Sequence, residues 1–254
     1  MKHRPAKEAS RRAKLGARTP VWVLGFTLLI GLSVAPAAGT SPGSSAAPGF
    51  LAAEEEPLTQ YRAFRRMHAK SERFNHEGWL DAWTEFDGRS FRYDVVSERG
   101  SEYVRNKVLR AVLKREQEIV AAGADKAALS EDNYEFTEAD EAGGDVKYVL
   151  LKPRRKDVSL VEGRMVLSRE GGELLRVEGK LSKNPSFWTS LVNIIRHFAK
   201  VDGVRVPVST ESIAKVKFAG QSRLDVVYEY ESINGRPVSV AGRQILASAG
   251  GGGR

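Results

Sequence analysis

The chain has 254 residues, of which 41% are hydrophobic and 28% are charged, proportions that are typical of a globular domain. Its formal net charge is +8, but the first 20 residues carry most of the excess and the remainder is close to neutral, which argues against a nucleic-acid-binding protein. Cysteine is absent, which excludes disulfides, cysteine-based metal sites, thiol catalysis and the acylated cysteine of a bacterial lipoprotein.

An export signal is expected at the N-terminus. A basic segment precedes the uncharged apolar run from Val21 to Val34, and Ala35-Pro36-Ala37 then places small residues where signal peptidase cleaves. The apolar run is shorter than the ~20 residues that span a bilayer comfortably. We therefore expect residues 1–37 to be a signal peptide cleaved after Ala37, which makes the mature protein periplasmic or otherwise extracytoplasmic. The alternative is an uncleaved N-terminal anchor in the inner membrane.

Two segments flank the expected folded body. Residues 38–57 are rich in Ser, Gly, Ala and Pro and end in acidic residues, a composition typical of a flexible linker. Four consecutive glycines close to the C-terminus indicate a disordered tail over residues 246–254. One domain, residues 58–245, lies between them, and we expect it to be a monomer.

The body begins with a predicted amphipathic helix. Leu58, Tyr61, Phe64 and Met67 recur at intervals of three or four residues, as on one face of a helix. The period then changes to two over residues 74–86 and again over 89–98. Because Asp-Gly at positions 87 and 88 separates these two alternating segments, they are expected to form a β-hairpin.

A second helix is predicted to follow Ser101, which can cap it, and to end at Gly123. From Val146 onward the pattern is almost purely that of strands, separated by short turns. The expected strands cover residues 146–153, 159–169, 173–182, 189–201, 206–220 and 223–233. Strands joined by tight turns pair antiparallel. The fold class is therefore α+β: one large antiparallel sheet with about two main helices packed on one face.

No motif in the chain indicates catalysis. There is no metalloprotease, P-loop, nucleophile-elbow or dinucleotide-binding signature. The body contains three histidines, His68, His76 and His197, and none has the spacing of a metal ligand. The acidic segment 138–145 lacks the spacing of a calcium-binding loop. We therefore expect no enzyme, no metal and no cofactor.

Two pairs of aromatic residues are candidate ligand-binding residues. Trp79 and Trp83 lie four residues apart on a strand and share a face with acidic residues, so they either form ordinary core under a helix or flank a groove for an apolar ligand. Phe187 and Trp188 follow an Asn-Pro turn and enter the next strand. As neighbours on a strand, they are expected to point to opposite faces, with one closing the interior and one lying at its rim.

Residues 58–233 as a whole resemble a known superfamily. The likeness lies in the order of elements and in four segments: Asn133–Phe136 (NYEF), Tyr148–Lys156 (YVLLKPRRK), Leu174–Trp188 (LLRVEGKLSKNPSFW) and Asp202–Ser212 (DGVRVPVSTES). They resemble the periplasmic lipoprotein-carrier superfamily, which includes the LolA, LolB and RseB-like folds, and in particular its exported members with outer-membrane lipoprotein-sorting domains. The resemblance implies an unclosed β-half-barrel with helices in its concave side.

The resemblance also implies two functions. In the carriers, the apolar interior shelters acyl chains of lipoproteins, so we expect a non-catalytic exported protein that binds a lipid, an acyl chain or a lipoprotein. In the RseB-like branch, the fold senses lipoproteins and restrains a stress-signalling cascade, so the alternative is an envelope module that docks a protein partner. No nucleic-acid partner is expected under either reading.

Overall fold

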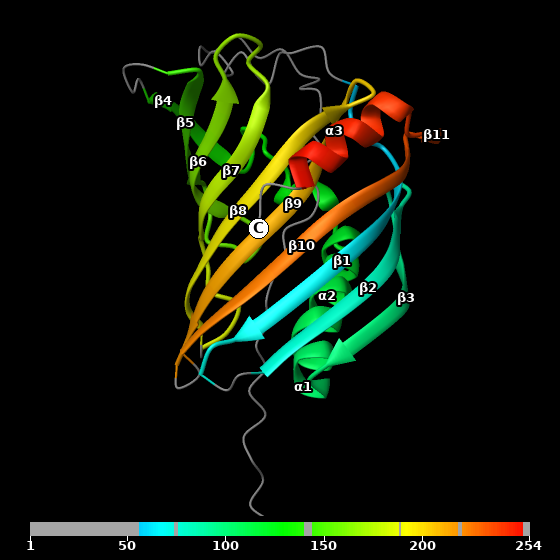
Figure 1. The fold of residues 1–254 in the computed structure, drawn as a ribbon. Helices are drawn as coiled ribbons and strands as arrows, with labels where there is room; N and C mark the ends of the chain where they lie inside the picture. The colour runs from blue at the N-terminus through cyan, green and yellow to red at the C-terminus, as the bar shows by residue number, and fades with distance from the viewer. Residues whose placement is uncertain (1–55, 74–75, 140–143, 188, 218–219, 251–254) are drawn as a thin grey trace, which may run out of the picture.

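The computed structural model of the chain describes residues 56–73, 76–139, 144–187, 189–217 and 220–250. Within them, ten strands form one antiparallel sheet in the order β3-β2-β1-β10-β9-β8-β7-β6-β5-β4 (Figure 1). The two-residue strand β11 (Arg236–Pro237) pairs with the end of β10. The ten strands are β1 (Tyr61–Ser71), β2 (His76–Phe86), β3 (Phe91–Gly100), β4 (Tyr134–Ala139), β5 (Val146–Pro153), β6 (Val161–Ser168), β7 (Leu174–Leu181), β8 (Thr189–Val201), β9 (Val204–Val216) and β10 (Gly220–Ile233).

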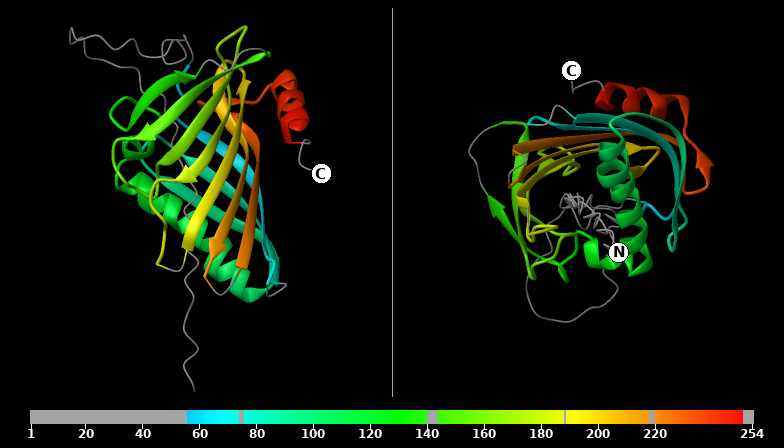
Figure 2. Two further views of the ribbon diagram at one scale, coloured as in Figure 1. Left: turned by 90° about the vertical axis from the view of Figure 1, so that its left-hand side faces the viewer. Right: turned by 90° about the horizontal axis from the view of Figure 1, so that it is seen from below.

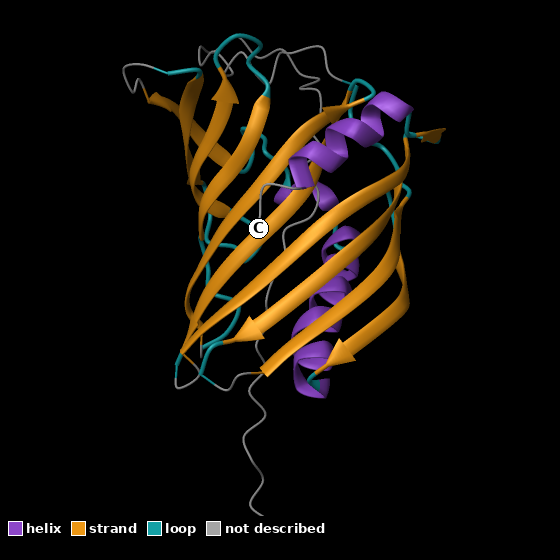
Figure 3. Ribbon diagram, viewed as in Figure 1, coloured by secondary structure: helices purple, strands orange, loops and turns teal. Residues whose placement is uncertain are grey.

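The sheet is strongly curved and does not close, because β3 and β4 are not paired with each other. Figure 3 shows strands making up most of the molecule, with one helix in front of the sheet and another behind it. The predicted α+β class, with a single large antiparallel half-barrel, is confirmed.

The predicted N-terminal helix is wrong, because residues 61–71 form the central strand β1. This strand is paired along its whole length with β10 on one side and β2 on the other. Its helical spacing arose from apolar residues on both faces of one strand. Phe64 packs against Trp83 on the convex face, with ring centroids 5.2 Å apart, while Met67 is buried on the concave face. A strand in the middle of a sheet can be apolar on both faces, so a strict period of two is lost.

The predicted β2–β3 hairpin is confirmed, and Asp87 holds its turn. The Asp87 carboxylate accepts hydrogen bonds from the backbone N–H groups of Ser90 (2.7 Å) and Arg89 (3.0 Å) and from the Ser90 hydroxyl (2.6 Å). These bonds stabilise the charged form, and they lower the pKa of Asp87 from 3.8 to about 2.

The predicted second helix is also confirmed. It consists of α1 (Glu102–Val104), the π-helical turn η1 (Arg105–Leu109) and α2 (Arg110–Ala121), followed by the 3-10 turn η2 (Ala124–Ala127). This segment lies inside the curve of the sheet, where it packs on β1, β2 and β3 (Figure 2). It connects β3 to β4, the two unpaired edges of the sheet.

The second helix of the structure, α3 (Val240–Gly250), was not predicted and includes part of the expected tail. It packs on β8, β9 and β10 from the convex side, so the two helices lie on opposite faces of the sheet and not together on the concave face (Figure 2). Ser239 precedes α3, and its Oγ accepts a hydrogen bond from the Gly242 N–H (3.0 Å). Asp202 in turn accepts hydrogen bonds from the Ser239 N–H (2.9 Å) and hydroxyl (2.5 Å).

Candidate functional site

The concave face of the sheet is the candidate site, and register shows which residues line it. Cross-strand partners point to the same face of a sheet. One transverse row of buried partners therefore lies on this face, running across eight strands from β5 to β2. Its members are Val149, Met165, Val177, Arg196, Thr210, Val226, Met67 and Leu80.

This row is apolar except at its centre, where Arg196 on β8 is paired with Thr210 on β9. Arg196 is only 4% exposed, and its Nε donates a hydrogen bond to the Thr210 Oγ1 (3.2 Å). That bond is the only polar side-chain contact that Arg196 makes within the described part of the chain, and no carboxylate there lies within ion-pair distance. A guanidinium is charged at any accessible pH. The centre of the concave wall therefore carries a buried, unpaired positive charge.

Buried hydroxyl groups continue from Arg196 across the same face. Ser212 lies two residues beyond Thr210 on β9, and Ser222 on β10 is the cross-strand partner of Ser71 on β1. All three serines are buried, and their Oγ atoms make no hydrogen bond within the described residues. We call Arg196, Thr210 and Ser212 the polar track; Ser222 and Ser71 lie apart from it, beyond Leu224.

A second buried cation on the concave face has a carboxylate partner, although its Nε makes no hydrogen bond within the described residues. Arg65 on β1 and Glu116 on α2 form a two-pronged ion pair: one Nη atom bonds Glu116 Oε2, and the other bonds Oε1 at 2.6 Å. The Tyr61 hydroxyl accepts a further bond from Arg65 (2.6 Å), and the guanidinium lies over the Tyr228 ring, 4.7 Å from its centroid. Arg65 is 1% exposed and Glu116 is 0% exposed.

These partners determine the charge of the interior. Although burial alone favours the neutral form, the nearby Glu116 carboxylate holds the pKa of Arg65 well above its ordinary value. Glu116 bonds Arg65 and Tyr61 and makes no hydrogen bond to Arg196. Burial raises the pKa of Glu116, and the charges of Arg65 and, to a smaller extent, Arg196 act against that rise. The buried charged groups among the described residues are thus two guanidiniums and one carboxylate, a net charge of +1.

The candidate tryptophans lie on the other, convex face. Trp79 stacks on His68 with centroids 5.0 Å apart, and Arg99 lies 4.6 Å from its ring centroid. Trp83 packs against Phe64, and the Arg62 guanidinium is 4.4 Å from its ring centroid. The helix α1–α2 covers the concave face, so neither tryptophan is packed beneath it.

A groove on the convex face contains Trp79. It has a volume of about 460 Å³, and its lining includes His68, Asp81, Arg99 and Asp225. His68 is hydrogen-bonded to Glu77 (Nε2 to Oε1, 2.7 Å). A neighbouring depression of about 360 Å³ shares His68 and Asp225, and it reaches His197 and the end of α3. These features are half-exposed, polar and aromatic, unlike the buried concave wall.

Of the second aromatic pair, only Phe187 can be placed. It lies in the turn before β8 and not in the strand, and it is 77% exposed, with the Lys217 ammonium 4.1 Å from its ring centroid. Phe187 therefore does not close the interior. Trp188 lies outside the described residues, as do the expected signal peptide and nearly all of the expected linker.

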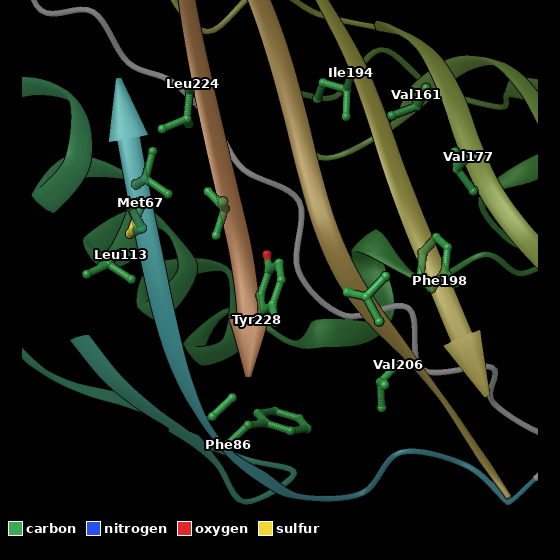
Figure 4. Close-up of a cluster of buried hydrophobic side chains, with 14 of the residues drawn as sticks. Met67, Phe86, Leu113, Val161, Val177, Ile194, Phe198, Val206, Leu224 and Tyr228 are labelled. Carbon is green, nitrogen blue, oxygen red and sulfur yellow. The ribbon is translucent and has the colours of Figure 1, made fainter. Parts of the chain in front are cut away.

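Figure 4 shows how the concave face is lined. Val161, Val177 and Ile194 project from β6, β7 and β8, whereas Met67 and Leu113 lie on the side covered by α2. No group of three or more His, Asp or Glu side chains in the described part of the chain is arranged to hold a metal. Among the same residues, no helix is long and apolar enough to cross a membrane.

Sequence reasoning missed Arg65, Glu116 and Arg196, although the strand pattern contained a signal for one of them. Val192, Ile194 and Phe198 mark one alternating set of β8, and Arg196 stands in phase with them. A charged residue in phase with apolar ones is expected to be buried and is costly unless it is paired. Glu116 carries the corresponding helical signal, because it stands four residues after Val112 and three before Ile119 on the buried face of α2.

Comparisons with known proteins found no matching family model and no matching curated protein. Among solved structures, a DUF1329 family protein from Desulfovibrio piger matches with a TM-score of 0.36 and 10% identity, over 68% of this chain and 84% of that chain. The LolA superfamily protein NE2245 from Nitrosomonas europaea matches with a TM-score of 0.33 and 10% identity, over 70% and 89%. MucB matches with a TM-score of 0.22 and 13% identity, over 82% and 98%.

One of these structures is thus a member of the superfamily that the sequence resembles. With TM-scores below 0.5, none of these likenesses says what the chain binds. The residues of the concave wall, and not the neighbours, carry the functional proposal.

Proposed function

We propose that the protein is a non-catalytic, extracytoplasmic binding protein that holds a lipid or a lipidated ligand against the concave face of its half-barrel. The observation that carries this proposal is the apolar concave wall, whose side chains on β5 to β8 are buried although the helix packs on β1 to β3. The helix α1–α2 packs on β1, β2 and β3, while β5 to β8 present apolar side chains to the same interior from the opposite wall.

Acyl chains are the natural partners of such a wall. Burial of an acyl chain is worth about 0.8 kcal/mol for each CH₂ group. Because the sheet is open between β3 and β4, the segment that connects these edges is the element that has to move when a long chain enters. The π-helical turn η1 lies within that segment, and such turns are frequent at functional sites.

The direct test is ligand uptake by the full chain purified from the cell envelope. Mass spectrometry of an organic extract is expected to detect bound lipid, and a fluorescent fatty acid is expected to bind in titration. The absence of both co-purified lipid and fatty-acid uptake would contradict the proposal.

A matched pair of variants locates the site. Val192→Phe adds volume to the concave face of β8, whereas Ile195→Phe adds the same ring to an exposed position of the same strand. We expect uptake to fall at least tenfold in the first variant only, with both variants showing a cooperative thermal transition. Equal uptake by the two variants would show that the ligand does not bind at the concave face.

The convex groove favours a second candidate function, an envelope module that docks a protein. Trp79, His68 and Arg99 stack there at a half-exposed surface, and aromatic and arginine residues are enriched in protein interfaces. A photo-crosslinking residue at Ser97, which lines the groove, is expected to capture a partner in cells, while one at the exposed Leu150 is not. Recovery of no protein from position 97 would count against docking at this groove.

A further inference from the structure

The unpaired charge of Arg196 identifies the chemistry of the ligand. Arg65 reaches its carboxylate within the protein, whereas Arg196 is 4% exposed and, among the described residues, has one hydroxyl as its hydrogen-bonding partner. Glu116 acts on Arg196 only at a distance, and a buried charge without a counter-ion in direct contact is unfavourable. The arrangement becomes favourable when a ligand supplies the missing anion.

An orphan hydroxyl close to Arg196 points to the same ligand. Ser212, Ser222 and Ser71 are buried, and each presents an Oγ atom that makes no hydrogen bond within the described residues. Most buried side-chain polar groups in native proteins do have partners. Only Ser212 is close to Arg196, because it lies two residues beyond Thr210 on the adjacent strand β9, about 7 Å along that strand. Ser222 and Ser71 lie about 13 Å along the sheet from the row of Arg196, beyond the buried Leu224, so a head group at Arg196 does not reach them.

We propose that the polar track binds the head group of an amphiphile that carries an anionic group, a carboxylate or a phosphate monoester, with that group against Arg196. A remaining oxygen of the head group accepts a hydrogen bond from the Ser212 hydroxyl, and the acyl chain extends along the apolar side of the row, over Val177 and Met165. This inference rests on the proposed function and names the class of ligand.

The test compares head groups on one acyl chain. Dodecyl phosphate, dodecanoate and the uncharged dodecyl glucoside are titrated into the full chain by calorimetry. At least one anionic compound is expected to bind tenfold or more tightly than the glucoside, and their order distinguishes phosphate from carboxylate recognition. Inorganic phosphate alone is expected to bind weakly, because it has no chain to bury.

Variants then assign the preference to the track. Arg196→Met is expected to lower the affinity for the preferred anionic compound roughly tenfold or more and to leave that for the glucoside unchanged, as for loss of a hydrogen bond to a charged group. Arg196→Lys retains part of the preference. Arg176→Met is the control, because Arg176 is on the neighbouring strand, points to the convex face and is paired with Glu178 (2.8 Å).

Several outcomes would overturn the inference. If the glucoside binds as tightly as both anionic compounds, the ligand needs no anionic group. The head-group inference then fails, whereas the proposed lipid binding stands. If Arg176→Met and Arg196→Met lower the affinity equally, the preference comes from general surface charge. If no compound binds, the proposed function fails as well. If Arg196→Met does not fold, as judged by a cooperative thermal transition, the inference is tested by the head-group preference of the wild-type chain and of Arg196→Lys.

Discussion

Arg65 and Glu116 join the sheet to the helix at a point where neither side chain meets solvent. The pair fixes α2 on β1, and Tyr61 adds hydrogen bonds to both groups. A buried pair of this kind is expensive to form but far more expensive to break. It therefore specifies where the helix lies on the sheet more than it adds to stability.

Removing one partner of the Arg65–Glu116 pair is expected to destabilise the folded protein strongly. Arg65→Met leaves Glu116 buried without its counter-ion, and the free energy of unfolding should fall by about 3–5 kcal/mol. The double variant Arg65→Met, Glu116→Leu should recover most of that loss, because it removes both charges. Urea unfolding monitored by tryptophan fluorescence measures both variants. A loss below ~1 kcal/mol in the single variant would show that the pair is solvated in solution.

The docking of α3 should depend on acidic pH through Asp202. Its hydrogen bonds with Ser239 lower the pKa of Asp202 below its ordinary value of 3.8. A carboxylate with a lowered folded-state pKa contributes stability above its unfolded value, and that contribution is lost as the pH falls through the folded value. Amide hydrogen exchange in α3 is therefore expected to be protected above pH 3.8 and to lose protection progressively below it.

A variant separates this contact from general acid unfolding. Ser239→Ala removes the side-chain cap, which is worth about 1 kcal/mol, and should speed exchange in α3 at neutral pH while leaving β1 and β2 unchanged. Ser248→Ala is the control, because its exposed hydroxyl bonds only to the backbone of the same helix. Equal exchange in the two variants would mean that Ser239 does not hold the helix.

The tryptophans provide a test of which face binds the ligand. Trp79→Ala removes a ring from the convex groove and leaves the concave face unchanged, so we expect fatty-acid uptake to remain within twofold of wild type. If a protein partner docks at the groove, we expect its crosslinking to be lost in this variant. Uptake in titration and photo-crosslinking at position 97 measure the two effects. Loss of uptake as large as that of Val192→Phe would place the lipid on the convex face.

A close approach of two strands should make one glycine irreplaceable. Gly163 on β6 and Gly179 on β7 are direct partners, and a Cβ on Gly179 would lie 2.4 Å from the Glu162 carbonyl oxygen and 2.8 Å from the Gly163 Cα. Gly179→Ala is expected to destabilise the domain by about 1–3 kcal/mol, because the backbone must move. Gly171→Ala meets only a flexible side chain at 3.5 Å and should change the melting temperature little.

Strands from Val146 onward could be predicted because alternation and tight turns agree there. The residues of β8, Thr189–Val201, match the expected range. β1 could not, since a central strand with Phe64 on one face and Met67 on the other imitates helical spacing. α3 was missed because its Ser-, Gly- and Ala-rich sequence resembles a tail, and only its contact with the convex face, through Leu246, makes it a helix.

The candidate site was harder to predict than the fold. The pairs that define it, Arg65 with Glu116 and Arg196 with Thr210, depend on which strand meets which element, and spacing along the chain does not contain that information. Aromatic residues suggested a site because they are conspicuous, but Trp79 and Trp83 lie outside the curve of the sheet.

The order of the sheet has a consequence for how the chain can be connected. Every neighbour along it is consecutive in sequence except β1 and β10, the first and last long strands, which meet in the middle. Asn234 joins this seam, since its side-chain oxygen accepts a hydrogen bond from the Thr59 N–H (2.8 Å). The architecture is a circularly permuted meander. A chain that is linked across this seam and opened within the β3–β4 connection would trace one uninterrupted zigzag, with the helix as a free end.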